Sequence, residues 1–226
     1  MFVLNKEQFR EFNLKEAKQF IEFWAKKYPK TKTKVINNGD KTIIYLDELN
    51  LENRLNRLTE ENIKRLLRWK DPRMLTEEKL SDPKKGRENE TVANVLKNLE
   101  NINAFRFGKM SEQDFKEKTG NISGIGKHTV YRMFLFHIAR PFEYPIADQN
   151  VYRAFSTQKQ TDVPKDWKGY MHYMDYFFEV AISAGIITEK PKGDESNIDD
   201  LVRNLKRVDE ALFAFGQFLY TYNRGE

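Results

Sequence analysis

The sequence contains no cysteine and only three histidines among its 226 residues. Without thiols the chain cannot form a disulfide bond, a thiolate metal centre or a cysteine nucleophile. It has no apolar run of about 18 residues, the length that a membrane-spanning helix needs, and residues 1–6 lack the apolar core of a signal peptide. We therefore expect a soluble, cytoplasmic protein without a membrane partner.

The three histidines do not form a metal-ligand pattern. His128 and His137 lie on one predicted helix at a spacing that places them on opposite faces, and His172 lies much further along the chain. We therefore expect no metal site formed by side chains.

Positive charge is in slight excess, since 39 Lys and Arg residues against 34 Asp and Glu residues give a net charge of +5. This balance is compatible with a nucleic-acid partner, although many basic proteins bind no polyanion. A chain of this length can bury a sizeable core, either as one domain or as two closely joined halves. Charge and length alone do not decide between functions.

Helical periodicity dominates the chain. Capping residues such as Asn13 and Thr59 predict helix starts, and Pro29, Pro72 and Gly185 predict helix ends. The predicted helices cover residues 14–28, 49–58, 60–69, 89–100, 111–120, 127–139, 166–184 and 198–222.

One short segment near the N-terminus has a different pattern. The β-branched runs 33–36 and 42–46 flank Asn37-Asn38-Gly39-Asp40, which is typical of a β-hairpin turn. The sequence therefore predicts a mainly α fold with one small N-terminal β-hairpin.

Two glycines stand two residues apart in Ile122-Ser123-Gly124-Ile125-Gly126-Lys127-His128-Thr129. They allow a tight turn between helices, and Ile122 and Ile125 would anchor that turn to a core. Backbone N–H groups of the turn and of the next helix would then be directed outward, where they can bind a phosphate. Lys127 adds a cation. A Gly-x-Gly pattern by itself fits an ordinary connection between helices equally well.

The surrounding sequence favours a helix on each side of this turn. Ser111, with Asp114 three residues later, predicts the N-cap of a helix that ends near Gly120. After the turn, apolar residues at helical spacing continue to Ala139, and Pro141 ends the segment. The local prediction is helix, glycine hairpin, helix.

A carboxylate follows this arrangement in Asp148-Gln149-Asn150-Val151-Tyr152-Arg153. Asp148 comes after a loop and before residues at helical spacing, which predicts a helix N-cap. A helix N-terminus favours the ionised form of the carboxyl group. A role as a cap alone is the alternative.

Residues 110–155 resemble the helix-hairpin-helix (HhH-GPD) DNA glycosylase superfamily, in which a glycine hairpin and a helix are followed by a loop and an Asp. The form of residues 148–153 is most similar to the Asp-x-Asn-Val-x-Arg of the adenine and mismatched-thymine glycosylase branch. The similarity covers about a fifth of the chain. A looser similarity links residues 208–216 to the helix that precedes the iron–sulfur loop of that branch.

The resemblance implies a helical barrel in which residues 1–226 form a single compact unit. One half, about 50–160, would contain the hairpin, and residues 1–49 and 161–226 would form the other. Double-stranded DNA would bind through its phosphates at the hairpin, whose implied contact residues are Ser123, Gly124, Ile125, Gly126, Lys127 and Thr129. In the family the hairpin carbonyls can hold a monovalent cation, which requires no particular side chain.

The resemblance also implies a catalytic site of Asp148, His128 and Asn150. An ionised Asp148 facing C1′ would stabilise positive charge on the sugar and orient the attacking water. His128 stands where lyase-competent relatives carry a Schiff-base lysine, which favours hydrolysis without strand cleavage. Asn150 would position the carboxylate or the adjacent backbone. The alternatives are an ordinary surface histidine and an ordinary first-turn residue.

Three features depart from the family pattern. Ser123 replaces the usual hairpin proline, and the loop 140–147 lacks the glycine often seen there. No glutamate can be assigned as the proton donor to the leaving base. Because the chain has no cysteine, it cannot build the four-thiolate iron–sulfur cluster of many relatives, and we expect no cofactor.

These patterns predict a monomeric, monofunctional DNA N-glycosylase that hydrolyses the N-glycosidic bond of a damaged or mismatched base, as in base-excision repair. The main alternative is a non-catalytic helix-hairpin-helix DNA-binding protein. A weaker alternative is a structural or partner-binding domain that does not contact DNA.

Overall fold

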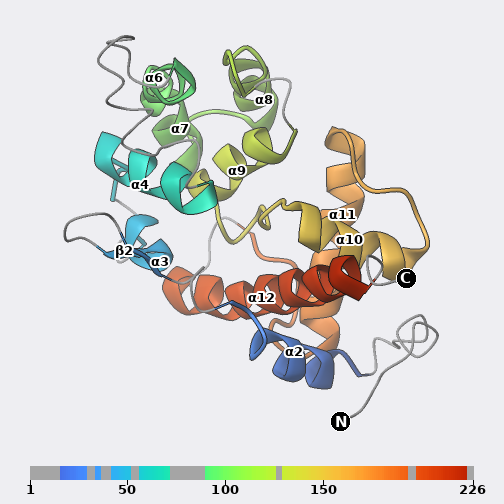
Figure 1. Cartoon of the computed structure of the whole chain (residues 1–226). Helices are drawn as coiled ribbons and strands as arrows, with labels where there is room; N and C mark the ends of the chain where they lie inside the picture. Colours follow the sequence, from blue (N-terminus) through green and yellow to red (C-terminus); the bar gives the residue numbers. More distant parts are fainter. Residues whose placement is uncertain are drawn as a thin grey trace. The chain divides into compact units, whose positions relative to one another are not determined.

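A computed structural model of the chain contains helices throughout and one pair of short strands (Figure 1). The structure describes residues 16–29, 34–36, 42–51, 56–71, 90–125, 129–192 and 197–222. Its elements are α2 (Ala17–Ala25), β1 (Lys34–Ile36), β2 (Thr42–Ile44), α3 (Tyr45–Glu48), α4 (Glu60–Lys70), α6 (Glu90–Leu96), α7 (Leu99–Arg106), α8 (Glu112–Gly120), α9 (Thr129–Ala139), α10 (Gln149–Lys159), α11 (Trp167–Ser183) and α12 (Ile198–Tyr222). The prediction of a mainly helical fold is confirmed.

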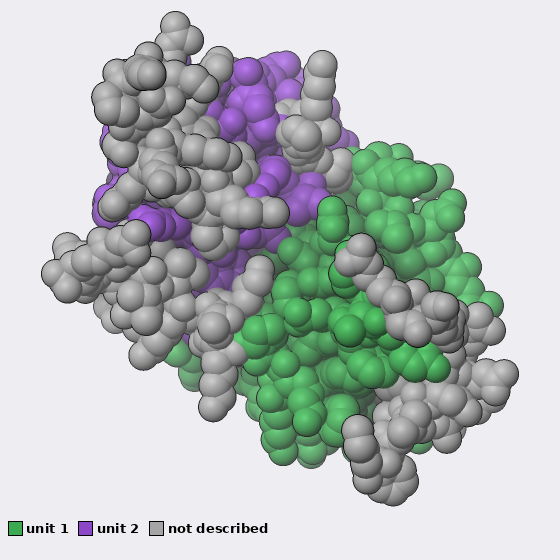
Figure 2. All heavy atoms as spheres, viewed as in Figure 1, with its two compact units in different colours: residues 1–29, 142–226 green, residues 30–141 purple. Residues whose placement is uncertain are grey.

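The chain forms two compact units, coloured separately in Figure 2. Unit 1 consists of residues 1–29 and 142–226, and unit 2 consists of residues 30–141. The sequence predicts one compact unit with divisions near residues 49 and 160, whereas the contacts divide the chain after residues 29 and 141. The predicted division near residue 160 moves to residue 141 because α10 packs along α12. This packing places α10 in unit 1, which contains both chain ends.

Unit 2 begins with the strand pair and continues through α3 to α9. β1 and β2 are antiparallel, with Val35 opposite Ile43, and the residues that connect them lie outside the described ones. Buried aromatic rings join the later helices of the unit. Phe105 of α7 stacks on Phe115 of α8 with 4.3 Å between ring centroids, and the edge of Phe136 of α9 meets Phe115 at 4.7 Å. This core holds α8 and α9 together at one end of the unit.

The predicted helix over residues 49–58 is not formed by the described residues of that stretch. Asn50 has a left-handed backbone, with φ +54°. The guanidinium of Arg106, on α7, donates to the backbone carbonyls of Leu49, Asn50 and Asn56 at 2.8–3.1 Å. Burial lowers the pKa of Arg106 to about 10. These carbonyls are satisfied by a distant cation, and no helix is needed to pair them.

The predicted helix over residues 89–100 is divided into α6 and α7. The side chain of Asn98 donates to the Asn94 carbonyl at 2.9 Å, and its backbone N–H donates to the Val95 carbonyl at 2.9 Å. Asparagine offers the backbone such local alternatives to continued helix. The break therefore follows from the chemistry of one polar side chain.

Unit 1 is organised around α12, against which α2 and α10 pack (Figure 1). On one side, Phe20 and Trp24 of α2 meet Phe215 of α12 at centroid distances of 5.4 and 5.3 Å. On the side of α12 that faces α10, the residue at the centre of the contact has no side chain. Gly216 of α12 lies directly against the backbone of Asn150, in the first turn of α10.

We expect Gly216→Ala to destabilise the protein much more than Gly185→Ala. A Cβ at position 216 would lie 1.9 Å from the Asn150 carbonyl oxygen, which cannot move without displacing α10. Such overpacking should cost about 3 kcal/mol or more. A Cβ at Gly185, where φ is +68°, would meet nothing within 4 Å, so only a left-handed backbone strain of about 1 kcal/mol applies. Urea denaturation measures both changes, and equal losses would contradict the close approach.

Candidate functional site

The glycine turn joins α8 to α9 within unit 2. Ser111 caps α8 by accepting from the Asp114 N–H at 3.1 Å. After the helix, Ile122 and Ile125 are buried, with 4% and 0% of their surface exposed, and the Ile125 N–H donates to the Ile122 carbonyl at 3.1 Å. The two isoleucines fix the turn to the core, as hydrophobic anchors of a connection would.

The residues between these anchors are solvent-exposed. Ser123 and Gly124 both lie on the surface, and Gly124 adopts a left-handed backbone with φ +81°. A Cβ at Gly124 would lie 2.3 Å from Thr91 Oγ1, so α6 packs closely against the turn. Position 124 therefore requires glycine for two separate reasons, its backbone angle and its lack of space.

The second half of the predicted hairpin lies outside the described residues. Gly126, Lys127 and His128 belong to this part, and the side chain of Thr129, the first residue of α9, is also not described. Their implied roles in phosphate binding and hydrolysis stay predictions. The monovalent cation at the hairpin carbonyls also stays a prediction, because some of these carbonyls belong to residues outside the described ones.

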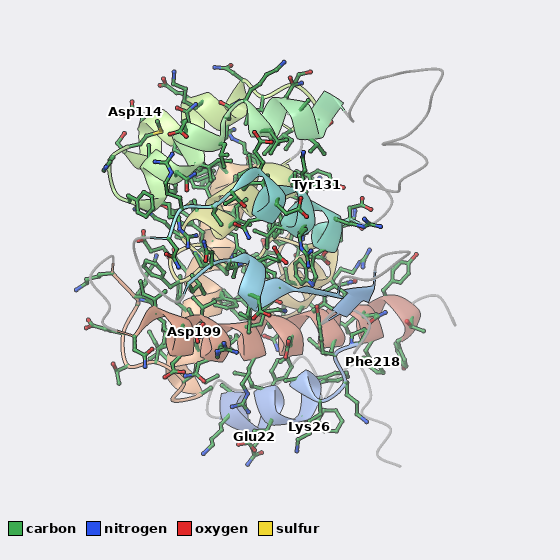
Figure 3. All side chains as sticks on the ribbon, turned by 90° about the vertical axis from the view of Figure 1, so that its left-hand side faces the viewer. Glu22, Lys26, Asp114, Tyr131, Asp199 and Phe218 are labelled. Atoms are coloured by element: carbon green, nitrogen blue, oxygen red, sulfur yellow. The ribbon has the colours of Figure 1, made fainter. Side chains whose placement is uncertain are left out.

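One side chain of α9 ties together the helices on either side of the turn, and a second ties α9 to the end of α4. Arg132 donates to the backbone carbonyl of Lys116 and to Thr119 Oγ1, both on α8. Tyr131, which Figure 3 labels, belongs to α9. Its hydroxyl donates to Asp71, at the end of α4, at 2.7 Å. The turn thus connects two helices that are held by side-chain contacts as well as by the core.

Asp148 lies in unit 1 as the N-cap of α10. Its half-buried carboxylate accepts a hydrogen bond from the Asn150 N–H at 2.8 Å. The Asn150 side chain accepts from Arg153 at 2.6 Å, and the Arg153 guanidinium lies over the Tyr220 ring at 4.4 Å. Asp148 and Asn150, which the sequence motif places two residues apart, are therefore in direct contact. The contact is made by the backbone N–H of Asn150, whereas its side chain pairs with Arg153.

Two tyrosine hydroxyls of α11 hold the chain immediately before Asp148. Tyr170 donates to the Pro145 carbonyl at 2.9 Å, and Tyr173 donates to the Ile146 carbonyl at 3.1 Å. Both tyrosines are fully buried. No sequence pattern indicates this role of the two hydroxyls, because aromatic residues at helical spacing on α11 indicate only a core. The carbonyls that they satisfy lie about 25 residues away in the chain.

Tyr152, on the first turns of α10, is a further buried tyrosine of this region. Only 2% of its surface is exposed, and its hydroxyl has no hydrogen-bond partner among the described residues. Burial raises the pKa of Tyr152, and the negative charge of Asp148 raises it further. The hydroxyl therefore stays protonated and remains a potential hydrogen-bond donor.

A second group of charges in unit 1 lies on α12. Lys206 donates to Asp209 at 2.5 Å, lies 3.7 Å from Glu210, and has its Nζ 4.6 Å from the centroid of the Tyr28 ring. Burial has the largest single effect and lowers the pKa of Lys206, but Asp209, Tyr28 and Glu210 together outweigh burial, and the pKa rises. A lysine held in its charged form is a poor nucleophile, so we assign this group to structure.

A cleft of about 610 Å³ also lies on unit 1, and it is lined by none of the predicted site residues. Its walls come from α2, from the end of α11 and from α12, and include Lys18, Glu22 and Arg207. The cleft carries charges of both signs and no aromatic ring that could stack on a base. It gives no support to a nucleobase pocket at this location.

No group of three or more potential metal ligands occurs among the described residues. His137 is buried and hydrogen-bonded to Tyr45, whereas His172 is exposed. None of the described helices is long and apolar enough to cross a membrane. Comparison of the chain with protein-family models, with curated proteins and with solved structures gave no match.

We expect Tyr173→Phe to destabilise the protein by about 1–3 kcal/mol, because it leaves the buried Ile146 carbonyl without its donor. The matched control is Tyr176→Phe, on the same helix. The Tyr176 hydroxyl is buried but has no partner among the described residues, so its removal should be close to neutral. Chemical denaturation of both variants measures the difference. A loss of stability for Tyr176→Phe as large as for Tyr173→Phe would show that the hydrogen bond does not hold the segment.

Proposed function

We propose that this protein is a helix-hairpin-helix DNA glycosylase that hydrolyses the N-glycosidic bond of a damaged or mismatched base in double-stranded DNA. The proposal includes the helical barrel of that class, with the β1 and β2 pair as its small hairpin. The observation that carries it is the N-cap of α10, where Asp148 and Asn150 of the sequence motif meet through a 2.8 Å hydrogen bond.

This cap suits the chemistry of base release. Breaking an N-glycosidic bond develops positive charge on the deoxyribose, and a fixed carboxylate near C1′ stabilises that charge without having to reorganise. The Asp148 carboxylate is fixed by the Asn150 N–H, and the preceding segment is fixed by Tyr170 and Tyr173. A helix N-terminus also favours the ionised form of a carboxyl group, which the role requires.

The turn between α8 and α9 suits phosphate binding. Its described residues Ser123 and Gly124 are exposed and carry no large side chain of their own, and Gly124 has the left-handed angle that such a turn needs. The next helix begins at Thr129, so its first N–H groups lie close in sequence to the turn. A phosphate bound here would place DNA by its backbone and not by its base sequence.

The reaction we propose is hydrolysis without strand cleavage. His128 occupies the position at which lyase-competent relatives carry lysine, and an imidazole does not form an imine with C1′. Lys206 is no substitute, because it is buried and charged against Asp209. The expected product is therefore an abasic site in an intact strand.

A non-catalytic DNA-binding protein is the alternative function. The observation that favours it is that no glutamate of the sequence can be assigned as proton donor to the leaving base. Such a protein would keep the phosphate-binding turn and would use Asp148 only as a helix cap. Binding and base release must therefore be measured separately.

For binding, we expect Ser123→Asp to weaken the affinity for duplex DNA. The substitution places a negative charge on the exposed turn, where it repels a docked phosphate, and it changes no buried contact. Loss of one phosphate contact should also reduce the slope of log K against log salt by about 0.9. Fluorescence anisotropy over a series of salt concentrations measures both quantities.

The control for this change is Gln113→Glu. Gln113 is exposed near the opposite end of α8, so the variant makes the same change in net charge away from the turn. If both variants lose the same small affinity, the turn acts only as a connection between helices.

For catalysis, we expect Asp148→Asn to keep DNA affinity and to reduce the rate of base release by about 10²–10³. Stability should fall by no more than about 1 kcal/mol, because asparagine is also a good N-cap. The assay is single-turnover release of bases from duplexes that carry alkylated, deaminated, oxidised or mismatched bases. The control Asp162→Asn removes an exposed carboxylate just after α10 and should leave the rate unchanged.

Two outcomes would count against the catalytic proposal. If the wild-type protein binds these duplexes but releases no base, the protein is a DNA-binding protein without this activity. If Asp148→Asn releases bases at the wild-type rate, the reaction uses another carboxylate.

A further inference from the structure

Arg153 of α10 is a half-buried positive charge that has no carboxylate partner. Its Nη1 donates to the Oδ1 of Asn150 at 2.6 Å, and its guanidinium carbon lies 4.4 Å from the centroid of the Tyr220 ring on α12. Among the described residues, Arg153 forms no ion pair. Taking a charge partly out of water is costly unless an anion compensates it. The guanidinium is therefore a cation that an anionic ligand would complete.

The packing of α10 along α12 fixes the position of this guanidinium (Figure 1). Gly216 and Tyr220 lie one turn apart on the same face of α12, and Gly216 contacts the backbone of Asn150. About one turn further along both helices, the Tyr220 ring meets the Arg153 guanidinium. A cation that is already held over a ring and by a hydrogen bond loses little freedom when it binds an anion.

The side chain of Asn150 offers a second donor at the same place. Because a guanidinium only donates, the Asn150 amide turns its oxygen toward Arg153. Its NH₂ group is therefore directed elsewhere, and it forms no hydrogen bond with any described residue. Asn150 and Arg153 are half-buried, and 41% of the surface of Tyr220 is exposed, so solvent reaches this group of side chains.

N–H donors with an uncompensated positive charge are suited to a phosphate group. A guanidinium matches the oxygens of a phosphate in both charge and planar geometry, and a neighbouring amide N–H adds a further bond. The backbone of DNA carries such a group at every nucleotide, and most contacts between proteins and DNA are made to it.

We propose that Arg153 and Asn150 bind a backbone phosphate of DNA, with Tyr220 as the support of the guanidinium. This inference rests on the proposed function, because DNA supplies the phosphate, and it adds a contact in unit 1 to the turn of unit 2. The backbone N–H of Asn150 holds the Asp148 carboxylate. The phosphate site and the candidate catalytic group thus share one residue, and a phosphate bound here fixes the DNA strand beside Asp148.

The first test measures duplex binding by three full-length variants. Arg153→Met removes the charge and keeps an unbranched side chain against Tyr220, whereas Arg153→Lys keeps the charge without the planar fork. The control Arg207→Met removes an exposed arginine from another part of α12. Fluorescence anisotropy over a series of salt concentrations gives the affinity and its salt dependence for each protein.

We expect Arg153→Met to weaken duplex binding about tenfold and to reduce the slope of log K against log salt by about 0.9, because one charge-assisted contact to a phosphate is lost. Arg153→Lys should keep the slope and bind more weakly than the wild type, since an ammonium lacks the fork. Arg207→Met should behave as the wild type. Equal losses for Arg153→Met and Arg207→Met would overturn the inference, and so would a slope that Arg153→Lys loses as fully as Arg153→Met.

The second test uses the wild-type protein without DNA. NMR follows the Nε–Hε resonance of Arg153 during a titration with inorganic phosphate and, separately, with acetate at the same ionic strength. We expect phosphate to move the resonance along a saturable curve and acetate to move it much less. A resonance that phosphate leaves in place, or that acetate moves equally, contradicts a phosphate site at Arg153.

The two tests separate the inference from the function on which it rests. If both succeed but the wild type releases no base, the phosphate site stands and the glycosylase function fails. If bases are released while Arg153→Met binds duplexes as the wild type does, the function stands and the inference is overturned. If phosphate moves the resonance but the wild type binds no duplex, the site serves a free phosphate compound, and both the DNA contact and the proposed function are wrong.

Discussion

The contact between Gly216 and the backbone of Asn150 is the constraint on which the candidate site depends. Because α12 has no side chain at this point, the first turn of α10 can lie directly on it. That turn includes the N–H group that Asp148 accepts from. The position of the carboxylate is therefore set by the packing of two helices, and a single Cβ at position 216 would be incompatible with it.

The segment that contains Asp148 is restrained from both directions along the chain. Before it, Tyr170 and Tyr173 hold the carbonyls of Pro145 and Ile146. After it, the backbone of Asn150 is seated on α12. Such restraint favours a group that stabilises charge only in a transition state. A carboxylate that is already held in position does not have to be ordered during the reaction.

Local rules were sufficient for much of this fold and for part of the site. The helix over residues 198–222 and the helix start after Thr59 follow from periodicity and capping, which depend on neighbours in sequence. The cap at Asp148 is of the same kind. The described residues of the stretch 49–58 differ because Arg106, about 50 residues further along the chain, satisfies the carbonyls of Leu49, Asn50 and Asn56. No pattern within those ten residues contains that information.

The tyrosines of unit 1 show the same limit more sharply. A sequence indicates that Tyr152, Tyr170, Tyr173 and Tyr176 are core residues, and their rings are indeed buried. It does not indicate where each hydroxyl points, and the hydroxyls differ: two of them pair with carbonyls just before Asp148, and two have no partner among the described residues. Because a buried hydroxyl gains stability only from a partner that the fold places beside it, the tertiary structure alone shows which of these phenols hold the backbone before Asp148. The restraint on the segment before Asp148 therefore comes from hydroxyl groups whose partners no local sequence pattern specifies.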